Sequence, residues 1–152
     1  MNYTNEFIHY GSSEFNNDYW CNPVTSEYGS KPMCGGLWAS PMDAVFSWKD
    51  FCERDDFFIE DLKESFKFKL KDNARVLVMR NIKDLEKIPT TDGEQFQFFK
   101  NALDFEKLSK EYDAVIAYLF EEGWDAHLRY VLTSWDVDSI LVLNKDIMEV
   151  IQ

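Results

Sequence analysis

A strict alternation of apolar and charged residues limits most strongly how this chain can fold. Over residues 65–71, phenylalanines and a leucine fall on every second position, and lysines follow each of them. Successive side chains of a β-strand point to opposite faces, so this period predicts a strand with one buried and one solvated face. Asp72 and Asn73 supply a turn, and residues 75–79, apolar after Arg75, predict a more buried strand that pairs with the first as a hairpin.

Four other runs of apolar, aromatic or β-branched residues are typical of short strands. They cover residues 7–10, 35–39, 114–119 and 139–143. Short helical signals separate these runs without a regular order. The pattern therefore predicts an α+β domain and not a doubly wound α/β domain.

Three segments carry helical signals. Ser40 is a suitable N-cap for a helix that runs to about Glu53, because a proline follows it and apolar residues continue at helical spacing. A short amphipathic helix is expected over residues 82–88, where the next residue is a proline. A further helix is expected from Thr91 or Asp92 onward.

The chain of 152 residues fits a single domain over residues 1–152, because it has no linker, internal repeat or low-complexity segment. Apolar residues make up 45% of it and aromatic residues 16%, enough to fill a core and to disfavour disorder. Residues 14–35 have no steady period and are rich in Asn, Ser, Pro, Tyr and Gly. They predict a long irregular loop, which in a compact domain is usually functional.

The net charge of −12, from 28 acidic and 16 basic residues, excludes a binder of long nucleic acids. Such a binder needs clustered Lys and Arg to neutralise phosphates. The lysines of residues 65–71 are expected to form a solvated strand face, with a small anion-binding stripe as the alternative. No apolar run reaches the length of a membrane span, and the first residues lack a signal peptide. We expect a cytoplasmic protein with no membrane partner and with a basic or small acceptor or partner.

Several site types are missing from the sequence. Cys21, Cys34 and Cys52 lack metal-ligand spacing, and only His9 and His127 accompany them, so we expect reduced thiols and no metal. The chain has no phosphate-binding glycine loop, no nucleophile elbow and no dinucleotide fingerprint.

Three short segments combine glycines or acids with residues that ligand binding uses. Residues 9–12 read His-Tyr-Gly-Ser, and residues 35–40 read Gly-Gly-Leu-Trp-Ala-Ser. Residues 135–140 read Trp-Asp-Val-Asp-Ser-Ile. In a strand, the period of two puts Asp136 and Asp138 on the same face. Carboxylates placed this way can stabilise a developing positive charge.

This trio resembles the ADP-ribosyltransferase superfamily, in its His-aromatic-acid branch of diphtheria-toxin-like and poly-ADP-ribose-polymerase-like enzymes. In that branch the first strand carries His-Gly-Ser or His-Gly-Thr, a second glycine-led strand carries an aromatic residue, and a late strand carries an acid. Here one residue separates His9 from the glycine, Trp38 stands at the aromatic position, and Asp138 stands where the family usually has Glu. The resemblance implies a split β-sandwich of two small sheets with flanking helices.

The resemblance also implies an activity: a small NAD-dependent ADP-ribosyltransferase, or an NAD glycohydrolase of the same fold. NAD is then a substrate, and the acceptor is an unknown protein or small molecule. The residues implied for catalysis are His9, Trp38, Asp136 and Asp138. Those implied for NAD binding are His9, Tyr10, Gly11, Ser12, Gly36, Trp38, Ser40 and Trp48.

Their expected roles follow from the chemistry of NAD. His9 would hydrogen-bond the adenosine-side ribose or the neighbouring pyrophosphate, and Gly11 would let the backbone approach the nicotinamide amide. Trp38 and Trp48 would stack on the cationic nicotinamide ring. One aspartate would hold a ribose hydroxyl while the other orients the sugar or the nucleophile.

Structural roles for the same residues remain open at this stage. His9 fits a strand-end histidine, Trp38 and Trp48 fit core aromatics, and Asp136 and Asp138 fit polar residues before a strand. The functional alternative is a catalytically degenerate acidic binding protein that engages a basic partner. A weaker alternative is a transferase that acts on RNA ends or free nucleotides.

The acid after the run at 114–119 is also open. Glu121 and Glu122 fit a solvated turn, and the alternative is that they supply the catalytic acid. His127 is expected to be structural or exposed.

Overall fold

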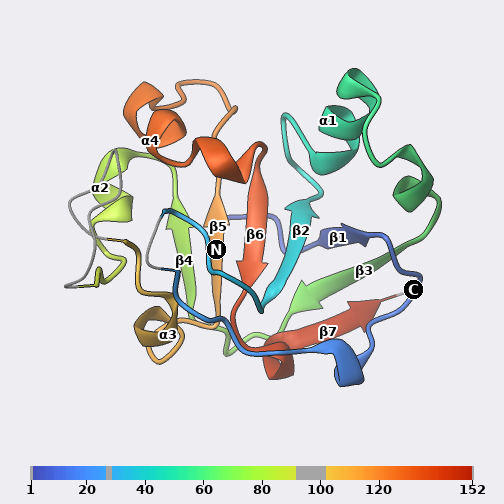
Figure 1. Cartoon of the computed structure of the whole chain (residues 1–152), viewed down its shortest axis with the longest axis horizontal. Coiled ribbons are helices and arrows are strands. Elements are labelled where there is room, and N and C mark those ends of the chain that lie inside the picture. The colour runs from blue at the N-terminus through green and yellow to red at the C-terminus, as the bar shows by residue number, and fades with distance from the viewer. Residues whose placement is uncertain (1, 27–28, 92–101, 152) are drawn as a thin grey trace.

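The computed structural model describes residues 2–26, 29–91 and 102–151 and has an α+β architecture (Figure 1). Within these ranges, seven strands form one mixed sheet in the order β4-β5-β6-β2-β1-β3-β7. The strands are β1 (Phe7–Tyr10), β2 (Leu37–Pro41), β3 (Ser65–Leu70), β4 (Val76–Met79), β5 (Ala114–Ala117), β6 (Ser139–Val142) and β7 (Met148–Ile151).

The sheet has two halves that share a single point of connection. Strands β4, β5, β6 and β2 run across the direction of β1, β3 and β7 in Figure 1. Strand β2 joins them because Leu37 to Ala39 pair with β6, whereas Ser40 and Pro41 pair with β1. The two sheets expected from the sequence are therefore halves of one hydrogen-bonded sheet.

The predicted hairpin is wrong. Strand β3 pairs with β1 and β7, and β4 pairs with β5 in the parallel sense. The turn after β3 thus carries the chain from one half of the sheet to the other. The alternation at β3 was interpreted correctly: Phe66, Phe68 and Leu70 are buried, while Lys69 is exposed.

Two apolar clusters hold the halves and helices together. Phe7 and Phe68 of one half pack in the same cluster as Ile116 and Ile140 of the other, so the halves face each other across a shared core. The second cluster lies on the opposite side of β5 and β6, where residues of α2, α3 and α4 cover the sheet. Full burial of a large apolar side chain contributes about 1.5–3 kcal/mol, so this shared core is a main source of stability.

The helices are short. They are α1 (Trp48–Asp55), α2 (Ile82–Leu85), α3 (Phe105–Leu108) and α4 (Ala126–Val131). In the part of the chain that the structure describes, four 3-10 helices accompany them: η1 (Asn17–Tyr19), η2 (Ile59–Lys63), η3 (Thr133–Trp135) and η4 (Lys145–Ile147). The helix expected over residues 82–88 is present as α2 but ends at Leu85. The one expected from Thr91 or Asp92 lies mainly on residues 92–101, outside the described residues, and beyond them helix α3 begins only at Phe105.

The expected start of α1 at Ser40 is wrong. Ser47 caps this helix through a capping box with Asp50, in which each side chain accepts a hydrogen bond from the other residue's backbone N–H. Ser40 instead lies in β2, and its hydroxyl accepts a hydrogen bond from the backbone N–H of Trp48 at 3.1 Å. The side chain therefore ties the start of α1 to the sheet.

The described part of the loop over residues 14–35 is irregular, as expected, apart from η1 and one bridge between Val24 and Cys34. It packs against η3 because the indole N–H of Trp135 donates to the carbonyl of Ser30 at 2.7 Å. The three cysteines are free thiols. Among the described residues, no helix has the length and apolar character needed to cross a membrane.

Candidate functional site

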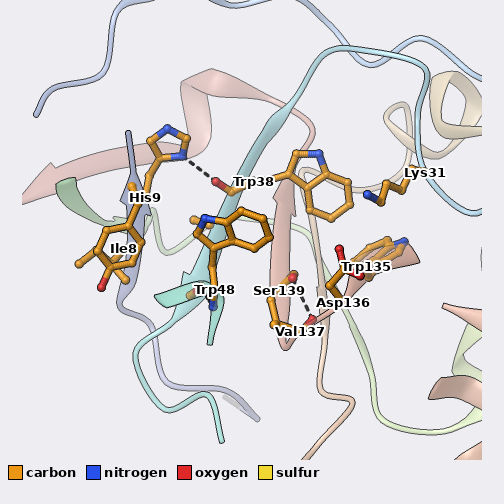
Figure 2. A pocket seen from close by; sticks show the side chains of 12 residues that line it. Ile8, His9, Lys31, Trp38, Trp48, Trp135, Asp136, Val137 and Ser139 are labelled. Atoms are coloured by element: carbon orange, nitrogen blue, oxygen red, sulfur yellow. Dashed lines mark hydrogen bonds between the residues drawn. The ribbon is translucent and has the colours of Figure 1, made fainter. Parts of the chain in front are cut away.

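A cavity of about 290 Å³ lies where the two halves of the sheet meet (Figure 2). His9 on β1 and Trp38 on β2 line it together with residues from the start of α1, from η3 and from the start of β6. Tyr10, Ser40, Trp48, Trp135, Asp136 and Ser139 also line this cavity. The structure thus brings six of the predicted site residues to one cavity: His9, Tyr10, Trp38, Ser40, Trp48 and Asp136.

His9 is fixed by a hydrogen bond across the junction. Its Nδ1 lies 2.7 Å from the carbonyl oxygen of Trp38 (Figure 2). A carbonyl oxygen only accepts, so Nδ1 carries the proton and a neutral His9 keeps Nε2 as an acceptor. Burial lowers the pKa of His9, and this hydrogen bond opposes the shift only in part. The imidazole is therefore neutral at pH 7.

Aromatic rings form the walls of the cavity. The rings of Trp38 and Trp135 meet edge to face with their centroids 4.8 Å apart, and Trp48 stacks on Phe51 at 5.4 Å. Lys31 Nζ lies 5.9 Å from the Trp38 ring centroid, so this wall already accommodates a cation. Its chemistry suits a planar ligand with partial positive charge.

Asp136 brings a carboxylate to this cavity. It follows η3, is exposed, and adopts a positive φ of 66° that non-glycine residues rarely use. Strand β6 starts only at Ser139, so the period of two does not extend back to Asp136. The expectation that Asp136 and Asp138 share a strand face is therefore wrong.

Asp138 has a different environment and is not among the residues that line the cavity. Its side chain is fully buried. One carboxylate oxygen accepts from the backbone N–H groups of Leu119 (2.6 Å) and Phe120 (3.0 Å), and the other accepts from Val45 (3.0 Å). These contacts give Asp138 a structural role in the folded chain.

Two more of the predicted residues lie at a second cavity of about 200 Å³, which also includes His9 in its lining. Ser12 and Gly36 line it. Gly36 has a φ of 73°, and a Cβ there would lie 2.9 Å from the carbonyl oxygen of Val142, so only glycine fits. Gly11, with a φ of 103°, borders open space. His9 thus contributes to two cavities.

Six lining residues were not among the predicted site residues, and they are Ile8, Lys31, Ala39, Trp135, Val137 and Ser139. Trp135 lies in a segment that the sequence had singled out, and its aromatic character was the available signal. Lys31 comes from the irregular loop, where no periodicity places a side chain. The alternative acid Glu121 pairs with Arg80 at 2.8 Å and does not line the cavity.

Comparisons of the chain with protein-family models, with characterised proteins and with solved structures find no match. Within the described ranges, no group of three or more His, Cys, Asp or Glu residues is arranged to hold a metal ion. The functional argument therefore rests on the geometry of the cavities.

Proposed function

We propose that the protein is a small NAD-dependent ADP-ribosyltransferase of the His-aromatic-acid branch, with the junction cavity as its nicotinamide and ribose site. The observation that carries this proposal is the meeting of His9, Trp38 and Asp136 at one cavity from three distant segments. The two sheet halves that pack face to face support a split β-sandwich of the same superfamily.

The aromatic walls account for recognition of the nicotinamide. Its pyridinium ring is planar and cationic, and the faces of Trp38 and Trp48 suit such a ring. The second cavity, which also includes His9, takes the adenosine side of NAD. His9 Nε2 then accepts a hydrogen bond from a ribose hydroxyl, as its neutral Nδ1–H tautomer allows.

Asp136 accounts for the chemistry. Cleavage of the bond between nicotinamide and ribose builds positive charge on the sugar, and nicotinamide leaves as a neutral base with the bonding electrons. A carboxylate beside the sugar stabilises that charge. Among the described residues that line the cavity, Asp136 is the one carboxylate, so it carries this role without Asp138.

Release of nicotinamide from NAD tests the proposal. We expect the purified chain to release nicotinamide and NAD to raise its melting temperature. Asp136→Asn should lower the rate about 100-fold or more, because it removes the charge that faces the sugar. The matched control is Asp146→Asn, the same change at an exposed position outside the cavities described above. No nicotinamide release and no thermal shift with NAD would end the proposal.

A second candidate is a binding protein of this fold that has lost catalysis. The observation that favours it is the commitment of Asp138 to backbone groups, which leaves the cavity a single acid in place of the family's longer Glu. In that case NAD is not turned over, and the acidic surface binds a basic partner. Salt-sensitive capture of a basic protein that is unaffected by NAD and by Asp136→Asn would favour this candidate.

A further inference from the structure

A third cavity, of about 250 Å³, meets the junction cavity at Asp136, which lines both. It lies between α1 and the segment of α4 and η3, which flank the upper end of β6 in Figure 1. Any group bound there is next to the carboxylate that the proposed function assigns to the reacting sugar. The third cavity is thus placed for the acceptor, and this inference rests on the proposed function.

Two arginines line this cavity, and aromatic rings hold both of them. The Arg129 guanidinium lies 3.8 Å from the ring centroid of Phe120 and also contacts the Trp124 ring. The Arg54 guanidinium lies 4.8 Å from the ring centroid of Phe46. Stacking occupies the face of a guanidinium and leaves its N–H edges for other partners. Nε and Nη2 of Arg54 already donate to Asp55, so Nη1 of Arg54 and the edges of Arg129 are the groups offered to an anion.

The two stacks are joined to each other. The rings of Phe46 and Phe120 pack with their centroids 5.0 Å apart, so the order of contacts is Arg54, Phe46, Phe120 and Arg129. This arrangement brings cations from helix α1 and helix α4 to one cavity although 75 positions separate them in the sequence.

The positive charge of this cavity is not typical of the protein. The chain has four arginines and a net charge of −12. Arg75 and Arg80 are paired with Asp113 and Glu121. Arg54 pairs with its neighbour Asp55, while no carboxylate among the described residues lies within ion-pair distance of Arg129.

We propose that the third cavity is the acceptor subsite and that it takes a small molecule bearing a phosphate or a carboxylate. Guanidinium edges match the paired oxygens of either group. A volume of about 250 Å³ suits a small molecule, and the apolar Leu119 and Leu132 line the remaining surface. From the net charge we expected a basic or small acceptor. The acceptor proposed for this cavity is small, but it is anionic and not basic.

The transfer step balances with one acid at the site. An oxygen of the phosphate or carboxylate, already deprotonated at pH 7, supplies the electron pair for the new bond to the anomeric carbon of the ribose. The bond from that carbon to nicotinamide breaks, and nicotinamide leaves neutral with its electron pair. No proton has to be removed from the acceptor, so the chemistry needs no second carboxylate.

Calorimetric titration of the full chain with phenyl phosphate, benzoate and benzyl alcohol tests the subsite. We expect the two anions to bind and the neutral alcohol to bind at least about tenfold more weakly. Arg129→Gln should raise the Kd of the anions at least about tenfold. Lys107→Gln removes the same charge from an exposed position of α3 and should change the Kd by less than about twofold. Arg54→Gln, at an exposed position, provides a second variant should Arg129→Gln fail to fold.

The arms of the experiment separate the outcomes. Binding of both anions supports the oxyanion chemistry, and binding of one identifies it as phosphate or carboxylate. Equal binding of benzyl alcohol, or no greater loss in Arg129→Gln and Arg54→Gln than in Lys107→Gln, overturns the subsite. With NAD present, mass spectrometry should detect the ADP-ribosyl adduct of the bound anion. If anion binding depends on Arg129 but no nicotinamide is released, the proposed function is rejected and the anion site stands. If nicotinamide is released but no anion binds, the anion site is rejected and the proposed function stands.

Discussion

Two aspartates just before β6 have opposite environments. Next to the strand, the carboxylate of Asp138 is fully buried and accepts three backbone hydrogen bonds. In the turn, Asp136 is exposed and lines two cavities. One residue separates them, so the difference comes from the backbone: the positive φ of Asp136 turns the chain before the strand pattern begins.

This difference teaches how a carboxylate is freed for a ligand. Asp138 has few acceptor positions left after three N–H groups, whereas the Asp136 carboxylate accepts no hydrogen bond from the described residues. Substitution of the buried acid should then lower the stability of the fold, whereas substitution of the exposed acid should leave it nearly unchanged. The predictions below test that contrast from the largest effect to the smallest.

Replacement of the buried acid should have the largest effect. Asp138→Ala removes the acceptor of three backbone N–H groups, one in a buried and two in partly buried hydrogen bonds, and we expect it to lower the free energy of unfolding by about 4 kcal/mol. For a domain of this size, that loss corresponds to roughly 8–16 °C in melting temperature. Urea titration followed by tryptophan fluorescence measures it.

Asp136→Asn serves as the control for this comparison, because asparagine tolerates a positive φ. We expect the free energy of unfolding to change by no more than about 0.5 kcal/mol. Similar losses for the two variants would mean that the contrast between the two acids is not real.

A second buried acid shows whether Asp138 is a special case. Asp113 accepts hydrogen bonds from the backbone N–H and the guanidinium of Arg75 and from the amide of Asn144. Asp113→Ala should lower the free energy of unfolding by about 2 kcal/mol at pH 7, less than Asp138→Ala because the Arg75 side chain is half exposed.

The stability that Asp113 contributes should also depend on pH. Burial alone raises the pKa of Asp113, but the hydrogen bonds from Arg75 and Asn144 outweigh it and leave the pKa below its usual value. A carboxyl whose pKa is lower in the folded state stabilises the fold above its unfolded pKa of about 3.9. The difference between the wild type and Asp113→Ala should therefore shrink as the pH falls below about 4. A difference that stays constant from pH 7 to pH 3 would contradict this explanation.

The smallest effect is expected on the cavity side, at His9. Burial lowers the pKa of His9 in the folded state, so the fold favours the neutral imidazole. Its contribution to stability is present above the unfolded pKa of about 6.5 and is lost as the pH falls through the lower folded pKa. Between pH 8 and pH 5.5, the urea midpoint of unfolding should fall further in the wild type than in His9→Gln. Equal shifts would show that His9 titrates as an exposed histidine.

The sequence predicted the features that depend on neighbouring residues. The alternation over residues 65–71 located β3, and short apolar runs located β1, β2, β5 and β6. The resemblance of three short segments to a known superfamily selected His9, Trp38 and Asp136, which the structure brings to one cavity. Each of these signals is a residue type at a short spacing.

Features that depend on distant contacts could not be predicted in this way. The pairing of β4 with β5 is set by the core, and a nearby turn gave a misleading hairpin. Ser40 and Ser47 have similar local signals, and only the pairing of β2 with β1 decides between them. The burial of Asp138 depends on Leu119 and Val45, which are remote in sequence. Strand β7 and helix α4 were not predicted.

Asp138 also governs how the third cavity can vary among related sequences. Its carboxylate holds Val45 and Phe120, and its own backbone N–H donates to the carbonyl of Phe46 at 3.1 Å. The two loops whose phenylalanine rings stack against Arg54 and Arg129 are therefore both hydrogen-bonded to one residue, Asp138. An insertion in either loop displaces the other through this attachment. In related sequences we therefore expect changes in one loop to be accompanied by changes in the other, while the aspartate is retained.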